Sequence, residues 1–184
     1  ELGDADGKLT YHEGDAQALT NAPGDTKYNA AVCLMALMNI ADINAVCRGA
    51  ASALDEDGSL IGVILHPAFR TPRQTSWGWV GANPQSQRQF RRIDAYMSET
   101  SAEITMNPGS ASSGAEAVTT TTFHRPISEY VRALAGAGFV LEDLEEWTSP
   151  RESEPGPRAD EENRARTEIP MFLAFRARLA PRAA

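Results

Sequence analysis

The chain has 184 residues, of which 42% are hydrophobic and 23% charged, so it fits one globular domain with a sizeable core. Its 17 basic and 25 acidic residues give a formal net charge of −8, which argues against non-specific binding to nucleic acid or to an anionic membrane. No apolar run is long enough to cross a bilayer, and the first residues lack the pattern of a signal peptide, so small-molecule chemistry is the favoured starting point.

The N-terminal part predicts two strands. Leu9–His12 is a short strand candidate, and the Gly14–Asp15 pair that follows indicates a turn. The apolar segment Tyr28–Leu34 is consistent with a strand buried on both faces.

A helix and another strand are predicted next. Asp42 is a suitable N-cap for an amphipathic helix that runs to Leu54, and Gly58 is expected to end it. Leu60–Leu65 is a second buried strand, which predicts that it lies beside Tyr28–Leu34 and parallel to it. The strand should end at the His66–Pro67 step, because proline has no N–H for the ladder.

Residues 70–122 differ in composition from the rest. They are rich in Arg, Gln, Ser, Thr and Gly, and five arginines form a local basic patch: Arg70, Arg73, Arg88, Arg91 and Arg92. The segment is expected to be a long excursion with one strand in Ala117–Phe123. It is predicted to be the most mobile part of the chain outside its termini, and to lie over the carboxyl edge of the sheet as a lid or substrate-binding element.

Regular structure is predicted again near the C-terminus. Pro126 suits a first helical turn, Gly138 should stop this helix, and Phe139–Glu145 should form a strand. The charged segment 151–168 is predicted to be a solvated loop. Residues 171–179 alternate apolar and polar side chains, which indicates a strand with one wetter face near a sheet edge.

The two cysteines, Cys33 and Cys47, lie in apolar surroundings without a CxxC spacing. They are predicted to be buried free thiols of a reducing compartment, which favours a cytoplasmic location. The histidines form no ligand spacing with the acids, so no metal is expected.

Five segments occur in a recognisable order: YHEGDAQAL (11–19), YNAAVCLMALMNIAD (28–42), LDEDGSLIGVILHPAF (54–69), FHRPISEYVRALAGAGFVLEDLEEW (123–147) and IPMFLAF (169–175). Together they resemble the class I S-adenosylmethionine-dependent methyltransferases, in particular a bacterial branch whose fifth strand ends in His-Pro-x-Phe. The resemblance implies a single, partial α/β domain over residues 1–184. Its Rossmann-like sheet would be mostly parallel, with the last two strands as an antiparallel hairpin. S-adenosylmethionine would be the cofactor and a small molecule the methyl acceptor.

One family feature has no match in this sequence. The glycine-rich turn after the first family strand and the acidic residue after the second are both lacking, which suggests that the N-terminal strands are missing from this chain. In the family order those strands lie between the third and the fourth, so Leu9–His12 is expected to lack a neighbour. Another copy of the chain, in a homo-oligomer, or a severed N-terminal piece should then fill the gap, or residues 1–20 should be displaced.

The resemblance also implies cofactor-binding residues. Asp15 matches the family acid that accepts a hydrogen bond from the adenine amino group, with the Ala16 backbone near the ring; the alternative is an Asp that caps a turn or helix. Cys33, Leu34 and Met35 would line the methionine side of the cofactor at the carboxyl end of their strand. Core packing is the alternative, at least as strongly for Cys33.

Six residues are candidates for the substrate side: His66, Phe69, Trp77, Tyr96, His124 and Arg125. His66 could act as a general base or orient the substrate, and its alternative is a structural histidine that ties the excursion to backbone. His124 and Arg125 could bind an anion or close a lid, against the alternative of a surface loop. The aromatic residues could line a pocket or form a small core within the excursion.

Two other functions remain open from the sequence. A nicotinamide-dependent Rossmann-like enzyme would need a GxGxxG turn after a strand, which this sequence lacks. A methyltransferase-like subunit without catalysis, which works by docking to a partner, is the second alternative.

Overall fold

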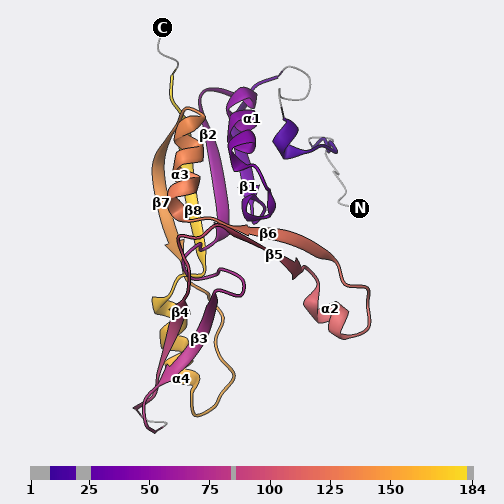
Figure 1. Cartoon of the computed structure of the whole chain (residues 1–184). Helices are drawn as coiled ribbons and strands as arrows, with labels where there is room; N and C mark the ends of the chain where they lie inside the picture. Colours follow the sequence, from indigo (N-terminus) through magenta and orange to yellow (C-terminus); the bar gives the residue numbers. More distant parts are fainter. Residues whose placement is uncertain (1–8, 20–25, 84–85, 182–184) are drawn as a thin grey trace.

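The computed structural model describes residues 9–19, 26–83 and 86–181. At its centre lies a four-stranded sheet with the order β1-β2-β8-β7 (Figure 1). The strands of this sheet are β1 (Tyr28–Leu34), β2 (Leu54–Leu65), β7 (Phe139–Trp147) and β8 (Phe172–Leu179).

The first two strands of the sheet are parallel neighbours, with Val32 opposite Ile61 and Leu34 opposite Val63. Helix α1 (Ile43–Ala53) connects them, and the Asp42 carboxylate accepts a hydrogen bond from the Ala45 N–H at 2.9 Å as its N-cap. The predicted strand–helix–strand unit is therefore confirmed.

The boundary between α1 and β2 differs from the prediction. Gly58 does not end the helix, because α1 already ends at Ala53 and β2 begins at Leu54. Leu54 is extended and buried in the core, so packing of this side chain fixes the start of the strand before the glycine is reached.

The sheet is mixed rather than mostly parallel. β8 runs antiparallel to β2 on one side and to β7 on the other, which agrees with the implied antiparallel pairing of the last two strands. β8 is therefore an inner strand next to the edge strand β7, which agrees with the expectation that it lies near an edge of the sheet. Its wetter face comes from Arg178, which is paired with Glu142 and Asp57, and from Arg176 rather than from an edge position.

One face of the sheet carries the core. α1 and α3 (Ile127–Gly136) cover this face and pack on buried side chains such as Leu60, Ile64 and Phe175. On the other face, Val32 is 59% and Leu34 61% exposed. The prediction that β1 is buried on both faces is therefore wrong, because no described element covers its second face or its free edge.

The excursion of residues 70–122 is more regular than predicted. It holds the β3–β4 hairpin, then β5, α2 and the first part of β6, where one strand was expected; the elements are β3 (Thr75–Val80), β4 (Arg88–Ile93), β5 (Thr100–Thr105), α2 (Pro108–Ser112) and β6 (Thr119–His124). Both hairpins extend away from the main sheet (Figure 1). Threonine and aromatic residues fit strands once a partner strand is present, although their composition alone predicted a loop. The lid role and the mobility remain predictions.

The segment 151–168 is not a loop throughout, because it contains α4 (Ala159–Glu168). Glu161 of this helix accepts the Gln89 N–H of β4 at 2.8 Å, and Arg164 donates to the Gln89 carbonyl at 3.1 Å. Ala165 is fully buried. These tertiary contacts explain a helix in a stretch whose charged composition predicted solvated coil.

At the N-terminus, Leu9–His12 is exposed and belongs to none of the described sheets, so the prediction of a strand there is wrong. The short 3-10 helix η1 (Ala16–Ala18) contacts α1, where the Gln17 side chain accepts the Asp42 N–H at 2.9 Å. The expectation that residues 1–20 are displaced falls partly on residues 1–8 and 20, outside the described residues.

Candidate functional site

The carboxyl ends of β1 and β2 lie side by side and form the edge at which ligands bind in open α/β sheets. After Leu34 the chain turns at Met35, whose φ of 54° is unusual for a residue other than glycine. The Met35 N–H donates to the Val63 carbonyl at 2.7 Å, and the 3-10 helix η3 (Leu37–Asn39) follows. Leu34 and Met35 thus stand exposed at this edge, whereas Cys33 faces the core.

His66 follows β2 directly and is almost fully buried, with 2% of its surface exposed. Its Nδ1 accepts the Ala68 N–H at 3.2 Å, and its Nε2 lies 2.7 Å from Glu146 Oε1 of β7. These contacts assign the proton to Nε2, which then donates to the carboxylate. Both ring nitrogens are occupied, so the geometry favours the structural alternative for His66 over a general base.

Phe69 belongs to the same turn. Its N–H and that of Arg70 donate to the His66 carbonyl at 3.2 and 2.8 Å, and its ring packs on the imidazole with centroids 4.7 Å apart. The His-Pro-x-Phe segment is therefore a compact turn that carries the chain from the sheet into the β3–β4 hairpin.

His124, at the end of β6, is buried between two parts of the excursion. Its Nε2 lies 2.7 Å from the Tyr96 carbonyl, and its Nδ1 lies 3.2 Å from Thr71 Oγ1. The Thr71 hydroxyl also contacts the Pro67 carbonyl at 2.7 Å. His124 thus connects the turn after β2 with both hairpins.

Arg125 is not in a surface loop, because only 8% of it is exposed. Its Nη2 donates to the Ile40 carbonyl at 2.9 Å and to the Ala41 carbonyl, and its guanidinium lies 5.2 Å from the Phe123 ring centroid. Its Nη1 is buried without a hydrogen-bond partner among the described residues. Burial raises the pKa of the neighbouring Tyr130 phenol, which the Arg125 charge opposes.

A small cavity of about 20 Å³ brings several of the predicted residues together. It is lined by His66, His124 and Arg125, and also by Arg70, which was noted in the sequence only as part of a basic patch. Phe69 lies at its border through its contact with His66. Three of the six substrate-side candidates thus line one cavity at the carboxyl edge of β2, and a fourth borders it, although they come from distant parts of the chain.

The two remaining aromatic candidates have other contacts. Trp77 of β3 lies under the Arg91 guanidinium, 5.1 Å from its ring centroid. The Tyr96 hydroxyl accepts the Ile127 N–H at 3.0 Å and so holds the start of α3.

Asp15 and Ala16 lie apart from this group. Both are exposed, and the Asp15 carboxylate accepts the Gln17 N–H at 2.9 Å as the N-cap of η1. This is the capping role that the sequence left open beside the adenine contact.

The cysteines are both free, as predicted, but only Cys47 is buried, whereas Cys33 is partly exposed. Burial raises the pKa of the Cys33 thiol, and it raises the pKa of Cys47 to about 11. Neither thiol is therefore activated as a nucleophile. In the described ranges, no cluster of three or more His, Cys, Asp or Glu side chains could hold a metal ion.

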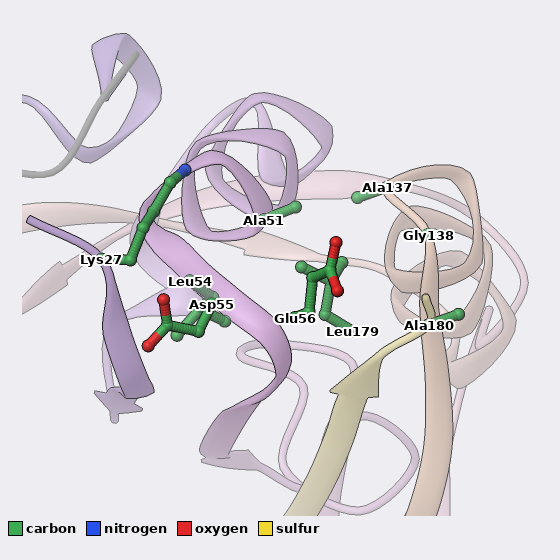
Figure 2. A pocket seen from close by; sticks show the side chains of 9 residues that line it. All are labelled: Lys27, Ala51, Leu54, Asp55, Glu56, Ala137, Gly138, Leu179 and Ala180. Atoms are coloured by element: carbon green, nitrogen blue, oxygen red, sulfur yellow. The ribbon is translucent and has the colours of Figure 1, made fainter. Parts of the chain in front are cut away.

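A larger hollow of about 390 Å³ lies at the opposite edge, where β1 and β2 begin (Figure 2). Lys27, Asp55 and Glu56 line it together with Leu54 and the turn at Ala137 and Gly138. Lys27 is already bonded to the Ser52 carbonyl. Because ligands of open α/β sheets bind at the carboxyl edge, this hollow is not the candidate site despite its size.

Comparison with solved structures relates the fold to known proteins. A S-adenosylmethionine dependent methyltransferase from Mesorhizobium loti is 25% identical, with a TM-score of 0.65 over 94% of this chain and 71% of that one. A protein from Listeria monocytogenes assigned to the same class is 22% identical, with a TM-score of 0.63 over 94% of this chain and 70% of that one. The CcbJ methyltransferase from Streptomyces caelestis is 14% identical, with a TM-score of 0.54 over 91% of this chain and 62% of that one.

No protein-family model matches the chain, and no curated protein sequence matches it. No helix in the part of the chain that the structure describes is long and apolar enough to span a membrane. The structural neighbours are S-adenosylmethionine-dependent methyltransferases, and the α/β fold of this chain matches their Rossmann-like fold.

Proposed function

We propose that this chain belongs to an enzyme that transfers a methyl group from S-adenosylmethionine to a small-molecule acceptor. The supporting observation is the carboxyl edge of the sheet, where the exposed Leu34 and Met35 of the β1 end lie beside the His66 turn of β2. The acceptor would bind under the two hairpins that leave this edge.

The described residues fit one side of the cofactor. Leu34 and Met35 offer an apolar wall, and the left-handed backbone at Met35 is a strained feature of a kind that occurs at binding sites. The adenine side fits less well, since the Asp15 carboxylate is exposed and already bonded within η1. We propose Cys33, Leu34 and Met35 as the cofactor floor, with Cys33 behind the exposed pair.

S-adenosylmethionine, when bound, supplies an electrophilic methyl group on a sulfonium. The chain would contribute chiefly by holding the acceptor in line with that methyl group, because correct orientation of the two reacting groups lowers the barrier to transfer. His66 and Glu146 would position the turn of residues 66–70, and Arg125 would fix the end of β6 against η3. Phe69, Trp77, Tyr96 and His124 would shape the acceptor side.

Calorimetric titration of the 184-residue chain with S-adenosylmethionine tests this proposal. Because the described residues fit only one side of the cofactor, S-adenosylmethionine should bind weakly. Leu34→Asp should abolish this binding, since it places a charge on the apolar floor. Val140→Asp, on an exposed position of β7, is the matched control and should leave the heat of binding unchanged. Absence of any binding would contradict a cofactor site in this chain. Micromolar binding that is lost in Asp15→Ala would instead show a complete site with its adenine contact.

A methyltransferase-like subunit without catalysis is a second candidate. This candidate is favoured by β1, which has a neighbouring strand on one side only in the described sheet. Val32 and Leu34 of this strand are exposed, so a partner could pair with its free edge. A partner that adds a strand there would cover both residues. In that case the chain would show no S-adenosylmethionine binding and would form a complex that Val32→Lys disrupts.

A further inference from the structure

Three arginines approach the carboxyl edge of the sheet without an acidic partner. The structure describes ion pairs for Arg88, Arg92 and Arg164 in or near the excursion, but none for Arg70, Arg91 or Arg125 among its described residues. The carboxylate of Glu146, which contacts His66, is already paired with that histidine. In a chain with a net charge of −8, three arginines without an ion pair in this region are unusual, and Arg70 is the one that lies close to each of the others.

Arg70 is the central member of this group. Its backbone N–H completes the His66 turn, but its side-chain Nε is buried with no hydrogen-bond partner in the described chain. A buried donor without an acceptor is costly, and guanidinium N–H groups form strong hydrogen bonds with anionic oxygens such as those of a carboxylate. An unmet donor at this edge therefore points to a ligand that supplies the acceptor.

The other two arginines are held in place by their own contacts. Arg91 Nε donates to the Phe69 carbonyl at 2.8 Å and its Nη2 to Thr75 Oγ1 at 2.6 Å, so it lies next to the Arg70 backbone. Arg125 is fixed through Nη2, and its buried Nη1 has no well-aligned hydrogen bond among the described residues, although the Tyr130 phenol interacts with this guanidinium. Both guanidinium groups also lie over aromatic rings, those of Trp77 and Phe123.

The electrostatics agree with an unfilled counterion position. Burial lowers the pKa of Arg70, and burial together with the Arg70 charge lowers the pKa of Arg91. Both directions reflect the cost of burying these charged guanidinium groups in the ligand-free protein. A bound anion would reverse this effect.

The shape of the site limits the class of anion. Arg70 and Arg125 line one cavity of about 20 Å³, which holds about one water-sized atom. One oxygen of a planar carboxylate fits such a space with the second oxygen outside it. Inorganic phosphate can also place one of its four oxygens there, but it leaves three oxygens and more charge outside the cavity than a carboxylate does.

We infer that Arg70 and Arg125 bind a carboxylate group of the acceptor, with the charge of Arg91 close to Arg70, so that the acceptor is an anionic small molecule. The identification of this molecule as a methyl acceptor rests on the proposed function. The carboxylate site itself does not, because anion binding is measured without the cofactor.

The first experiment titrates the full 184-residue chain with benzoate and follows the arginine Nε–H signals by NMR. Benzoate should shift the signal of Arg70, whereas benzamide, which has the same shape without the charge, should not. Inorganic phosphate, which leaves more charge outside the cavity, should shift it less than benzoate does. Equal responses to benzoate and benzamide, or to benzoate and phosphate, would overturn the carboxylate assignment.

The second experiment compares Arg70→Gln with Arg73→Gln, which removes the same charge from an exposed position in the same segment. Arg70→Gln should weaken benzoate binding about tenfold or more, because a charged hydrogen bond is lost. Its Tm should rise, since an unpaired charge near Arg91 is removed. Arg73→Gln should change neither value. The inference is overturned if Arg70→Gln leaves benzoate binding unchanged, or if Arg73→Gln weakens it equally. It is also overturned if Arg70→Gln lowers the Tm or unfolds the chain, because Arg70 would then be a structural residue.

The two proposals fail in different measurements. If benzoate binds at Arg70 while S-adenosylmethionine does not bind the chain, the carboxylate site stands and methyl transfer is wrong. If the cofactor binds while benzoate does not, the proposed function stands and the carboxylate inference is wrong.

Discussion

The main sheet and the β3–β4 hairpin contain the same local arrangement, a glycine directly opposite a phenylalanine on the neighbouring strand. In the sheet, Gly62 of β2 faces Phe175 of β8, and in the hairpin, Gly78 of β3 faces Phe90 of β4. Each ring lies over its glycine, so that an added Cβ would come within 2.2 Å of Phe175 or 2.5 Å of Phe90. Phe175 is 5% exposed and Phe90 42%.

This difference shows that the same glycine–phenylalanine pairing can respond differently to an added methyl group, depending on how tightly the ring is packed. Phe175 is enclosed by the core and has no room to move away from a new methyl group. Phe90 borders solvent and can turn outward. The central sheet should therefore respond to small changes in volume, and the hairpin should tolerate them.

The largest effect is expected where the two regions join, at Arg125. Arg125→Met removes the hydrogen bonds to the Ile40 and Ala41 carbonyls that hold the end of β6 against η3. Because these are charged hydrogen bonds in a buried setting, the free energy of unfolding should fall by about 2–4 kcal/mol. Urea unfolding measures this change. Arg132→Met, an exposed arginine of α3, is the control, and an equal change in both variants would show that Arg125 does not join the regions.

The glycine pair tests the comparison directly. Gly62→Ala should lower the free energy of unfolding by about 1–3 kcal/mol, because the new Cβ overpacks a closed core. Gly78→Ala should change it by about 0.5 kcal/mol or less, since Phe90 can move into solvent. Both values come from the same urea titrations. Equal losses would mean that the hairpin is packed as tightly as the sheet.

The smallest effect is expected at the contact between α4 and the hairpin. The Arg164 hydrogen bond holds the pKa of the Glu161 carboxyl at about 2, below its ordinary value of 4.5, although desolvation opposes this shift. Since the pKa is lowered in the folded state, this contact contributes stability above about pH 4.5. The contribution should decline as the pH falls towards about 2.

Hydrogen exchange of the Gln89 amide measures this contact, because its N–H donates to Glu161. Glu161→Gln should speed its exchange at pH 6, where the wild-type contact is intact. Glu162→Gln, on the same helix, is the matched control and should have no effect. Slow exchange in Glu161→Gln at pH 6 would show that the backbone alone holds this amide.

The local sequence determined several elements of the sheet and its helices. Asp42 caps α1, Pro126 precedes α3, and the apolar runs form β1 and β2 as parallel neighbours. These features depend on side-chain periodicity and on capping within a few residues, so they can be predicted without knowledge of distant partners. The end of β2 at His66–Pro67 follows from the proline in the same way.

Only the tertiary structure decided the rest. The alternation in β8 predicted a strand but not its place between β2 and β7, because a wet face arises equally from an edge and from paired arginines. The composition of 151–168 predicted coil, and the contact of Glu161 with β4 makes it a helix. The candidate site depends on long-range contacts most of all. From the sequence, Arg125 was compatible with a surface loop and Arg70 was part of a basic patch. In the folded chain both line one cavity beside His66, and each has a buried donor without a well-aligned hydrogen bond among the described residues.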